Sequence, residues 1–139
     1  MMTAKEYLRQ IHVLDLKIKH KQAEKDMLIK KAYGVSAVTS DPNKVQTSAS
    51  TEGPMRYVEK AADLEKTIDR MIDEYIDLRD TIINQIHQLK DPRYIEILHE
   101  RYVDCHSFEL IAVNMNYSIR QIYQIHGDAL QEFTAVNLM

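Results

Sequence analysis

The chain has 139 residues, of which only 3 are Gly and 3 are Pro, and its formal net charge at pH 7 is −3. So few helix-breaking residues favour an all-α protein with room for one domain, or for one small domain and an extended element. The single cysteine, Cys105, excludes an intramolecular disulfide. The charges spread along the N-terminal segment exclude a signal peptide or a membrane span, so we expect a cytoplasmic protein.

Charge is distributed unevenly along the chain. Residues 1–40 contain 8 Lys or Arg against 4 Asp or Glu, a net charge of +4. Residues 41–90 contain 7 against 10 (−3), and residues 91–139 contain 3 against 7 (−4). The N-terminal segment is therefore basic and the C-terminal segment acidic.

The first predicted helix covers residues 3–33. Thr3 and Glu6 have the spacing of a capping box, and Gly34 supplies a stop. Two lysines, Lys21 and Lys25, interrupt the apolar seam of this helix, so we expect it not to cover all of the apolar surface of the second long helix. The other seam positions recur at spacings of three and four: Tyr7, Ile11, Leu14, Ile18, Leu28 and Ala32.

Residues 34–53 contain seven Ser or Thr and show no hydrophobic periodicity. This composition predicts a flexible linker, with a segment that becomes ordered on a partner as the alternative.

The second predicted helix begins near Pro54 and carries an uninterrupted coiled-coil seam for more than thirty residues. At about 1.5 Å per residue it would be roughly 50 Å long. Ile72, Ile76 and Ile83 form a second apolar stripe, so we expect this helix to pack against the first one and against a second copy of the chain. Residues 1–90 are thus predicted to form a helical hairpin that mediates homodimerisation. The seam residues are Tyr57, Ala61, Leu64, Ile68, Met71, Tyr75, Leu78, Ile82, Ile86 and Leu89.

Residues 91–139 predict a helix-turn-helix domain. Asp91 and Pro92 end the long helix and start another, whose inward residues are Ile95, Leu98 and Tyr102. Ser107 opens a short helix, and Asn116 suits a left-handed turn. Ser118, with Gln121 three residues later, forms a second capping box that opens the last helix. The predicted inner residues of the two last helices are Phe108, Ile111, Ala112, Met115, Ile122, Ile125, Ala129 and Leu130.

The outer face of the last helix carries the residue types that read DNA in a groove. Arg binds guanine with two hydrogen bonds, Gln does the same with adenine, and Tyr reaches a phosphate or a thymine methyl group. Gly127 on this face either permits close backbone approach or is simply tolerated. The predicted DNA-binding residues are Ser118, Arg120, Gln121, Tyr123, Gln124 and Gly127.

The stretch "SFELIAVNMNYSIRQIYQIHGDAL" resembles region 4 of bacterial sigma factors, and "DPRYIEILHERYV" resembles the lead-in to that region. Nearly the whole chain is similar to small phage and prophage transcription regulators of Gram-positive bacteria, akin to the RinA and ArpU types. The resemblance implies promoter contacts by Arg120, Gln121 and Gln124, with Tyr123 beside them. Because Arg120 is the single cation there, non-specific attraction to phosphate would be weak, which favours a regulator that acts with host RNA polymerase.

Other functions have less support in the sequence. A protein-interaction adaptor that docks on RNA polymerase or a sigma factor without reading bases is the first alternative, and a phage DNA-packaging component is another. His99, Cys105, His106 and His126 lack the spacing of a metal site, and three scattered glycines cannot form a phosphate loop. We therefore expect no enzyme, metal or cofactor.

The lysines of residues 17–31 are expected to form a solvated helix face. The alternative is that they contact DNA that flanks the target site.

Overall fold

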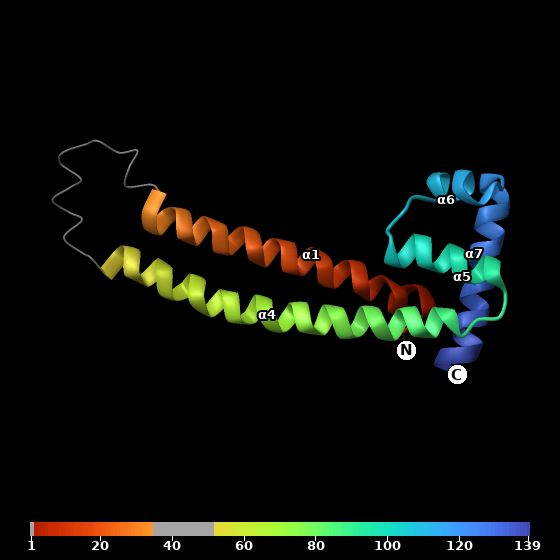
Figure 1. Ribbon diagram of the computed structural model, residues 1–139, viewed down its shortest axis with the longest axis horizontal. Helices are drawn as coiled ribbons and strands as arrows, with labels where there is room; N and C mark the ends of the chain where they lie inside the picture. Colours follow the sequence, from red (N-terminus) through yellow and green to blue (C-terminus); the bar gives the residue numbers. More distant parts are fainter. Residues whose placement is uncertain (1, 35–51) are drawn as a thin grey trace. The chain divides into compact units, whose positions relative to one another are not determined.

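The computed structural model describes residues 2–34 and 52–139, and all regular structure in these two ranges is helical (Figure 1). The predicted all-α class is confirmed. Of the predicted linker, only Gly34, Glu52 and Gly53 belong to the described residues. The elements are α1 (Ala4–Ile29), η1 (Lys30–Gly34), α4 (Glu52–His87), α5 (Pro92–Leu98), η2 (His99–Val103), α6 (Phe108–Met115), α7 (Ile119–Phe133) and η3 (Thr134–Leu138), where η marks a π-helical segment.

The ends of the long helices follow local side-chain chemistry. Thr3 Oγ1 accepts a hydrogen bond from the Glu6 amide at 3.2 Å, so it satisfies one of the free amides at the start of α1. α4 begins two residues before Pro54, which therefore lies in the first turn, where a missing amide hydrogen costs no helical bond. Asp91 caps α5 by accepting from the Arg93 amide at 2.9 Å, as the sequence predicts.

The described residues pack into two compact units, and α1 and α4 contribute residues to both. The unit formed by residues 16–73 contains an antiparallel pair of helical segments. Lys25 Nζ lies 3.4 Å from Glu65 Oε1, and Lys31 Nζ lies 5.7 Å from the centre of the Tyr57 ring. The predicted seam is buried here at Ile18, Ala32, Ala61 and Ile68.

The other unit combines residues 1–15 with residues 74–139. Its core is shared by the start of α1, the second half of α4 and all of the C-terminal helices. Short helices expose too much of their surface to be stable alone, which explains why α5, α6 and α7 use the apolar faces of the long helices. This grouping does not coincide with the predicted division between residues 90 and 91. The buried core residues are Ala4, Leu8, Ile11, Ile82, Ile86, Leu89, Ile97, Leu98, Tyr102, Val103, Ile111, Ala112, Ile122, Ile125, Ala129 and Phe133.

The helices of the described ranges are too polar or too short to cross a bilayer. Across residues 2–34 and 52–139, none combines the length with the apolar character that a membrane-spanning helix needs.

Candidate nucleic-acid interface

The last two helices are joined by a tight turn. Ser107 caps α6 through its Oγ, which accepts a hydrogen bond from the Leu110 amide at 3.1 Å. Asn116 ends α6 in the left-handed conformation, with φ 59° and ψ 41°, as predicted. Because asparagine tolerates this conformation better than most residues, the chain reverses within a few residues and α7 begins after Ser118.

The start of α7 is fixed by the predicted capping box. Ser118 Oγ accepts from the Gln121 amide at 3.2 Å, and Gln121 Oε1 accepts from the Ser118 amide at 2.9 Å. Both side chains, predicted to contact DNA, are thus engaged in starting the helix. Base recognition by the Gln121 carbonyl oxygen would require this box to open.

α7 has one buried face and one exposed face. Ile122, Ile125, Ala129 and Phe133 lie in the core. The opposite face holds four residues that the sequence predicts to contact DNA and that are all exposed: Arg120, Tyr123, Gln124 and Gly127. Their spacing of three or four residues places them side by side on one face. We refer to these four residues as the outer face of α7.

Tyr123 and Gly127 differ in their surroundings. The Tyr123 ring is 52% exposed and packs edge-on against Phe108, with 5.2 Å between the ring centres. This contact limits the motion of the ring while leaving half of its surface accessible. A Cβ atom placed on Gly127 would meet nothing within 4 Å, so packing within the described part of the chain does not require a glycine there.

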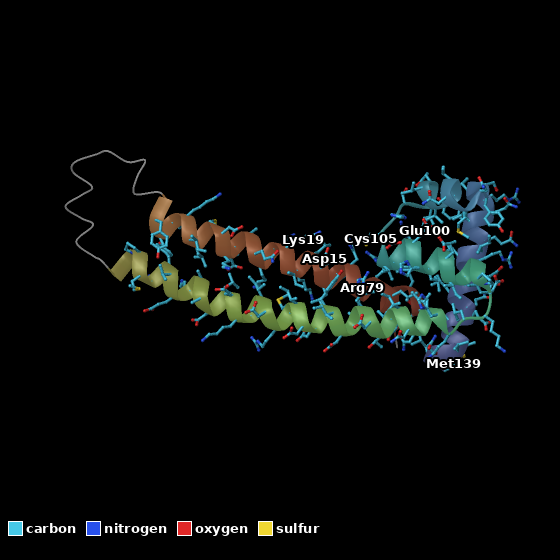
Figure 2. The ribbon with its side chains drawn as sticks, viewed as in Figure 1. Asp15, Lys19, Arg79, Glu100, Cys105 and Met139 are labelled. Carbon is cyan, nitrogen blue, oxygen red and sulfur yellow. The ribbon has the colours of Figure 1, made fainter. Side chains whose placement is uncertain are left out.

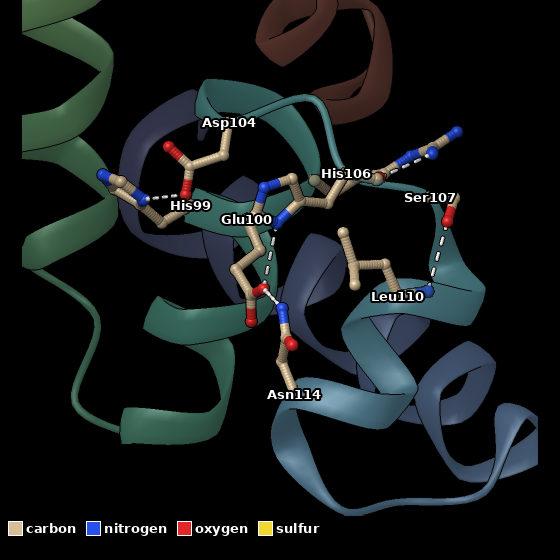
Figure 3. Close-up of polar contacts among 8 residues, drawn as sticks. His99, Glu100, Asp104, His106, Ser107, Leu110 and Asn114 are labelled. Carbon is tan, nitrogen blue, oxygen red and sulfur yellow. Dashed lines mark hydrogen bonds and ion pairs between the residues drawn. The ribbon is translucent and has the colours of Figure 1, made fainter.

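A buried carboxylate ties α6 to the preceding segment (Figure 3). Glu100 Oε1 accepts a hydrogen bond from Asn114 Nδ2 at 2.7 Å and lies 3.1 Å from His106 Nδ1. Burial alone would raise the pKa of Glu100, but the hydrogen bonds of Asn114, His106 and Glu96 together outweigh it and hold the pKa below its usual value. Glu100 therefore stays ionised in the core and positions α6.

A second buried polar pair ties η2 to α7. The Tyr102 hydroxyl and His126 Nε2 are 2.7 Å apart, and the His126 ring also packs edge-on against Phe108. Burial lowers the pKa of His126 to about 4 and raises that of Tyr102 to about 12. Both groups are therefore neutral at pH 7, and His126 lies at the helix interface.

The sequence reasoning missed several residues that support this region. Phe133 is fully buried, and its spacing of four from Ala129 could have identified it. The partnership of Glu100 with His106 and Asn114 has no such signal, because the three residues come from different segments.

The described residues contain no group of three or more His, Cys, Asp or Glu side chains able to hold a metal ion. Cys105 Sγ and His12 Nδ1 lie 3.7 Å apart, which brings two of the four ligands of a tetrahedral site together. His99 instead contacts Asp104, with 3.2 Å between Nδ1 and Oδ2. Neither of these pairs supplies the ligand set of a metal centre.

Charge on α7 is sparse. Arg120 is its single Lys or Arg, and Asp128 and Glu132 are exposed on later turns. This helix alone would therefore exert little long-range attraction on an anion. No protein-family model matches this chain, and no curated protein or solved structure matches it significantly.

Proposed function

We propose that this chain is a sequence-specific DNA-binding protein that inserts α7 into the major groove and regulates phage or prophage transcription together with host RNA polymerase. The observation that carries the proposal is the outer face of α7, which is exposed and polar on a helix whose opposite face is buried. A surface of this kind on a rigidly packed helix suits groove recognition.

The dimensions and chemistry of the outer face fit a short run of base pairs. Residues 120–127 span about 10 Å of helix, which matches the rise of roughly three base pairs. Arg120 would donate two hydrogen bonds to a guanine, and Gln124 would both donate to and accept from an adenine one turn later. Tyr123, held against Phe108, would contact a phosphate or a thymine methyl group.

Because α7 carries few cations, other surfaces would have to contribute contacts to DNA. Non-specific affinity grows with the number of cationic contacts to phosphate, and α7 supplies one. A homodimer would double these contacts and would require paired half-sites in the target. Contact with RNA polymerase would have the same effect, and the resemblance of residues 107–130 to sigma region 4 supports such a partner.

The proposal is tested by binding to a selected target. Duplexes bound by the protein are enriched from a random pool, and the affinity of the best duplex is measured for Arg120→Ala and Gln124→Ala. Each substitution should cost about 1–3 kcal/mol and relax the preference at one base position. Arg56→Ala in α4 and Gln88→Ala just after it, both at exposed positions, are the matched controls and should bind as the wild type does. An unselective pool, or equal losses for controls and test variants, would contradict the proposal.

A second candidate function rests on exposed apolar side chains of α6. Val113 is 72% exposed and Leu110 is 43% exposed, although both belong to a helix with a buried face. Such side chains suit a protein partner, so the domain would then be an adaptor that docks on RNA polymerase or a sigma factor. Capture of polymerase that survives nuclease treatment and is lost in Val113→Lys, with no duplex preference, would favour this function over DNA reading.

A further inference from the structure

A basic cavity of about 350 Å³ lies in the unit that contains α7, and no residue of that helix lines it. One wall is the start of α1, where Lys5, Arg9 and His12 follow each other at helical spacing. The other wall comes from η2 and the residues after it, among them Cys105 (labelled in Figure 2), which follows η2 in the chain and precedes α6. The lining residues are Lys5, Arg9, His12, Arg101, Tyr102 and Cys105.

Two of the cations that line this cavity lack an ion-pair partner within the described part of the chain. None of its lining residues is a carboxylate, and neither Lys5 nor Arg9 forms an ion pair with another described residue. Both side chains are exposed. Cations four residues apart on a helix repel each other, so an anion in the cavity would relieve an unfavourable interaction.

Two contacts fix the orientation of the Arg101 side chain. Its Nη1 donates to the His106 carbonyl oxygen at 3.0 Å, and its Cζ lies 4.1 Å from the centre of the Phe108 ring. These contacts fix the plane of the guanidinium and leave further N–H donors for a ligand. A guanidinium with a fixed orientation binds phosphate more specifically than a mobile one.

The positive charges of the cavity affect the pKa values of two neighbouring residues, Tyr102 and His126. The charges of Arg101 and Arg9 oppose the rise that burial causes in the pKa of Tyr102. The charges of Arg101 and Lys5 add to the lowering that burial causes in the pKa of His126. Both effects agree with a local positive potential around the cavity.

We propose that Lys5, Arg9, His12 and Arg101 bind a phosphate group in this cavity, and that a backbone phosphate of the duplex read by α7 supplies it. The assignment of DNA as the source rests on the proposed function. Arg101 contacts Phe108, and Phe108 contacts Tyr123 on the outer face of α7, with 5.2 Å between the two rings. The cavity is thus linked by two direct contacts to the surface that would enter the groove.

The first experiment tests the cavity without DNA. Cys105, the single cysteine of the chain, is exposed in the cavity wall and reports occupancy through its rate of alkylation by iodoacetamide. Inorganic phosphate is titrated at constant ionic strength. At about ten times its Kd it should slow alkylation about tenfold, because the rate follows the unoccupied fraction. The double variant Lys5→Gln/Arg9→Gln should lose this protection, whereas Lys17→Gln/Lys30→Gln, with the same change in charge outside the cavity, should keep it.

The second experiment measures the salt dependence of duplex binding. Loss of one phosphate contact should reduce the slope of log K against log salt concentration by about 0.9. We expect this reduction in Lys5→Gln/Arg9→Gln, with the preferred base sequence unchanged, and no reduction in Lys17→Gln/Lys30→Gln.

The outcomes separate the two proposals. Absence of phosphate protection together with an unchanged slope would overturn the phosphate site. Protection with an unchanged slope would overturn DNA as the source and assign the cavity to a free phosphate ester. If the wild-type protein binds no duplex, the proposed function is overturned. The alkylation experiment alone then shows whether the cavity binds phosphate.

Discussion

Gly127 occupies an exposed position in the middle of α7, where a glycine weakens the helix. Since a Cβ atom there meets nothing within 4 Å, Gly127→Ala should raise the free energy of unfolding by roughly 0.5–1 kcal/mol. If the backbone of α7 approaches DNA closely, the same substitution should lower affinity for the selected duplex. Urea denaturation and duplex titration measure the two effects.

Gly34→Ala serves as the control, because this glycine also has room for a methyl group and lies in η1. It should leave duplex binding unchanged. If Gly127→Ala gains stability and binds DNA as tightly as the wild type, Gly127 is merely tolerated.

His126 makes the stability of the protein depend on pH. Its pKa is lowered by burial from 6.5 to about 4, so between these values the unfolded chain binds a proton that the folded chain does not. Stability should therefore be greatest above pH 6.5 and fall as the pH drops from 6.5 toward 4. Urea denaturation at several pH values should show this decline, and His126→Gln should flatten it. An equally steep decline in the variant would assign the effect to other groups.

At the scale of elements, the Glu100 cluster connects η2 with α6. Asn114→Ala removes one hydrogen bond from a buried carboxylate and should cost about 1–3 kcal/mol of unfolding free energy. In a Glu100→Gln background the same substitution should cost less, because a neutral amide is easier to bury than an ion. Urea denaturation of the four proteins in a double-mutant cycle measures the difference. Identical costs in both backgrounds would mean that the charge of Glu100 is unimportant here.

Most element boundaries could be predicted because their signals are local. The Ser118–Gln121 capping box, the Asp91 cap and the left-handed Asn116 each depend on residues within one turn. The π-helical turn of η2 could not be predicted from periodicity. It buries Glu100 and Val103 beside Tyr102, the one residue of the three that the sequence predicts to face inward.

For the candidate sites too, the sequence predicts what depends on neighbouring residues and not what depends on distant segments. The outer face of α7 follows from the 3.6-residue period and was available from the sequence. The basic cavity was not, because it requires the start of α1 to lie against residues nearly a hundred positions later. The spacing of Lys5, Arg9 and His12 was visible, but without the second wall it reads as a solvated helix face.

At the scale of the molecule, the predicted homodimer would cover exposed apolar residues on the long helices. Ile76 is 50% exposed and belongs to the second apolar stripe of α4. Sedimentation equilibrium should give twice the chain mass of 16.3 kDa for the wild type and a lower mass for Ile76→Gln, with unchanged helix content. Glu74→Gln, at a neighbouring exposed position, is the control. A monomeric wild type at tens of micromolar would contradict the dimer.

Insertion of the outer face of α7 into a DNA groove can be tested by site-specific photo-crosslinking. A photoreactive side chain replaces Gln124 in one protein and the exposed Gln88, just after α4, in another, and each is irradiated with the selected duplex. Crosslinks to bases are expected from position 124 and none from position 88. Equal crosslinking from both positions, or crosslinks from 124 to RNA polymerase but never to DNA, would contradict it.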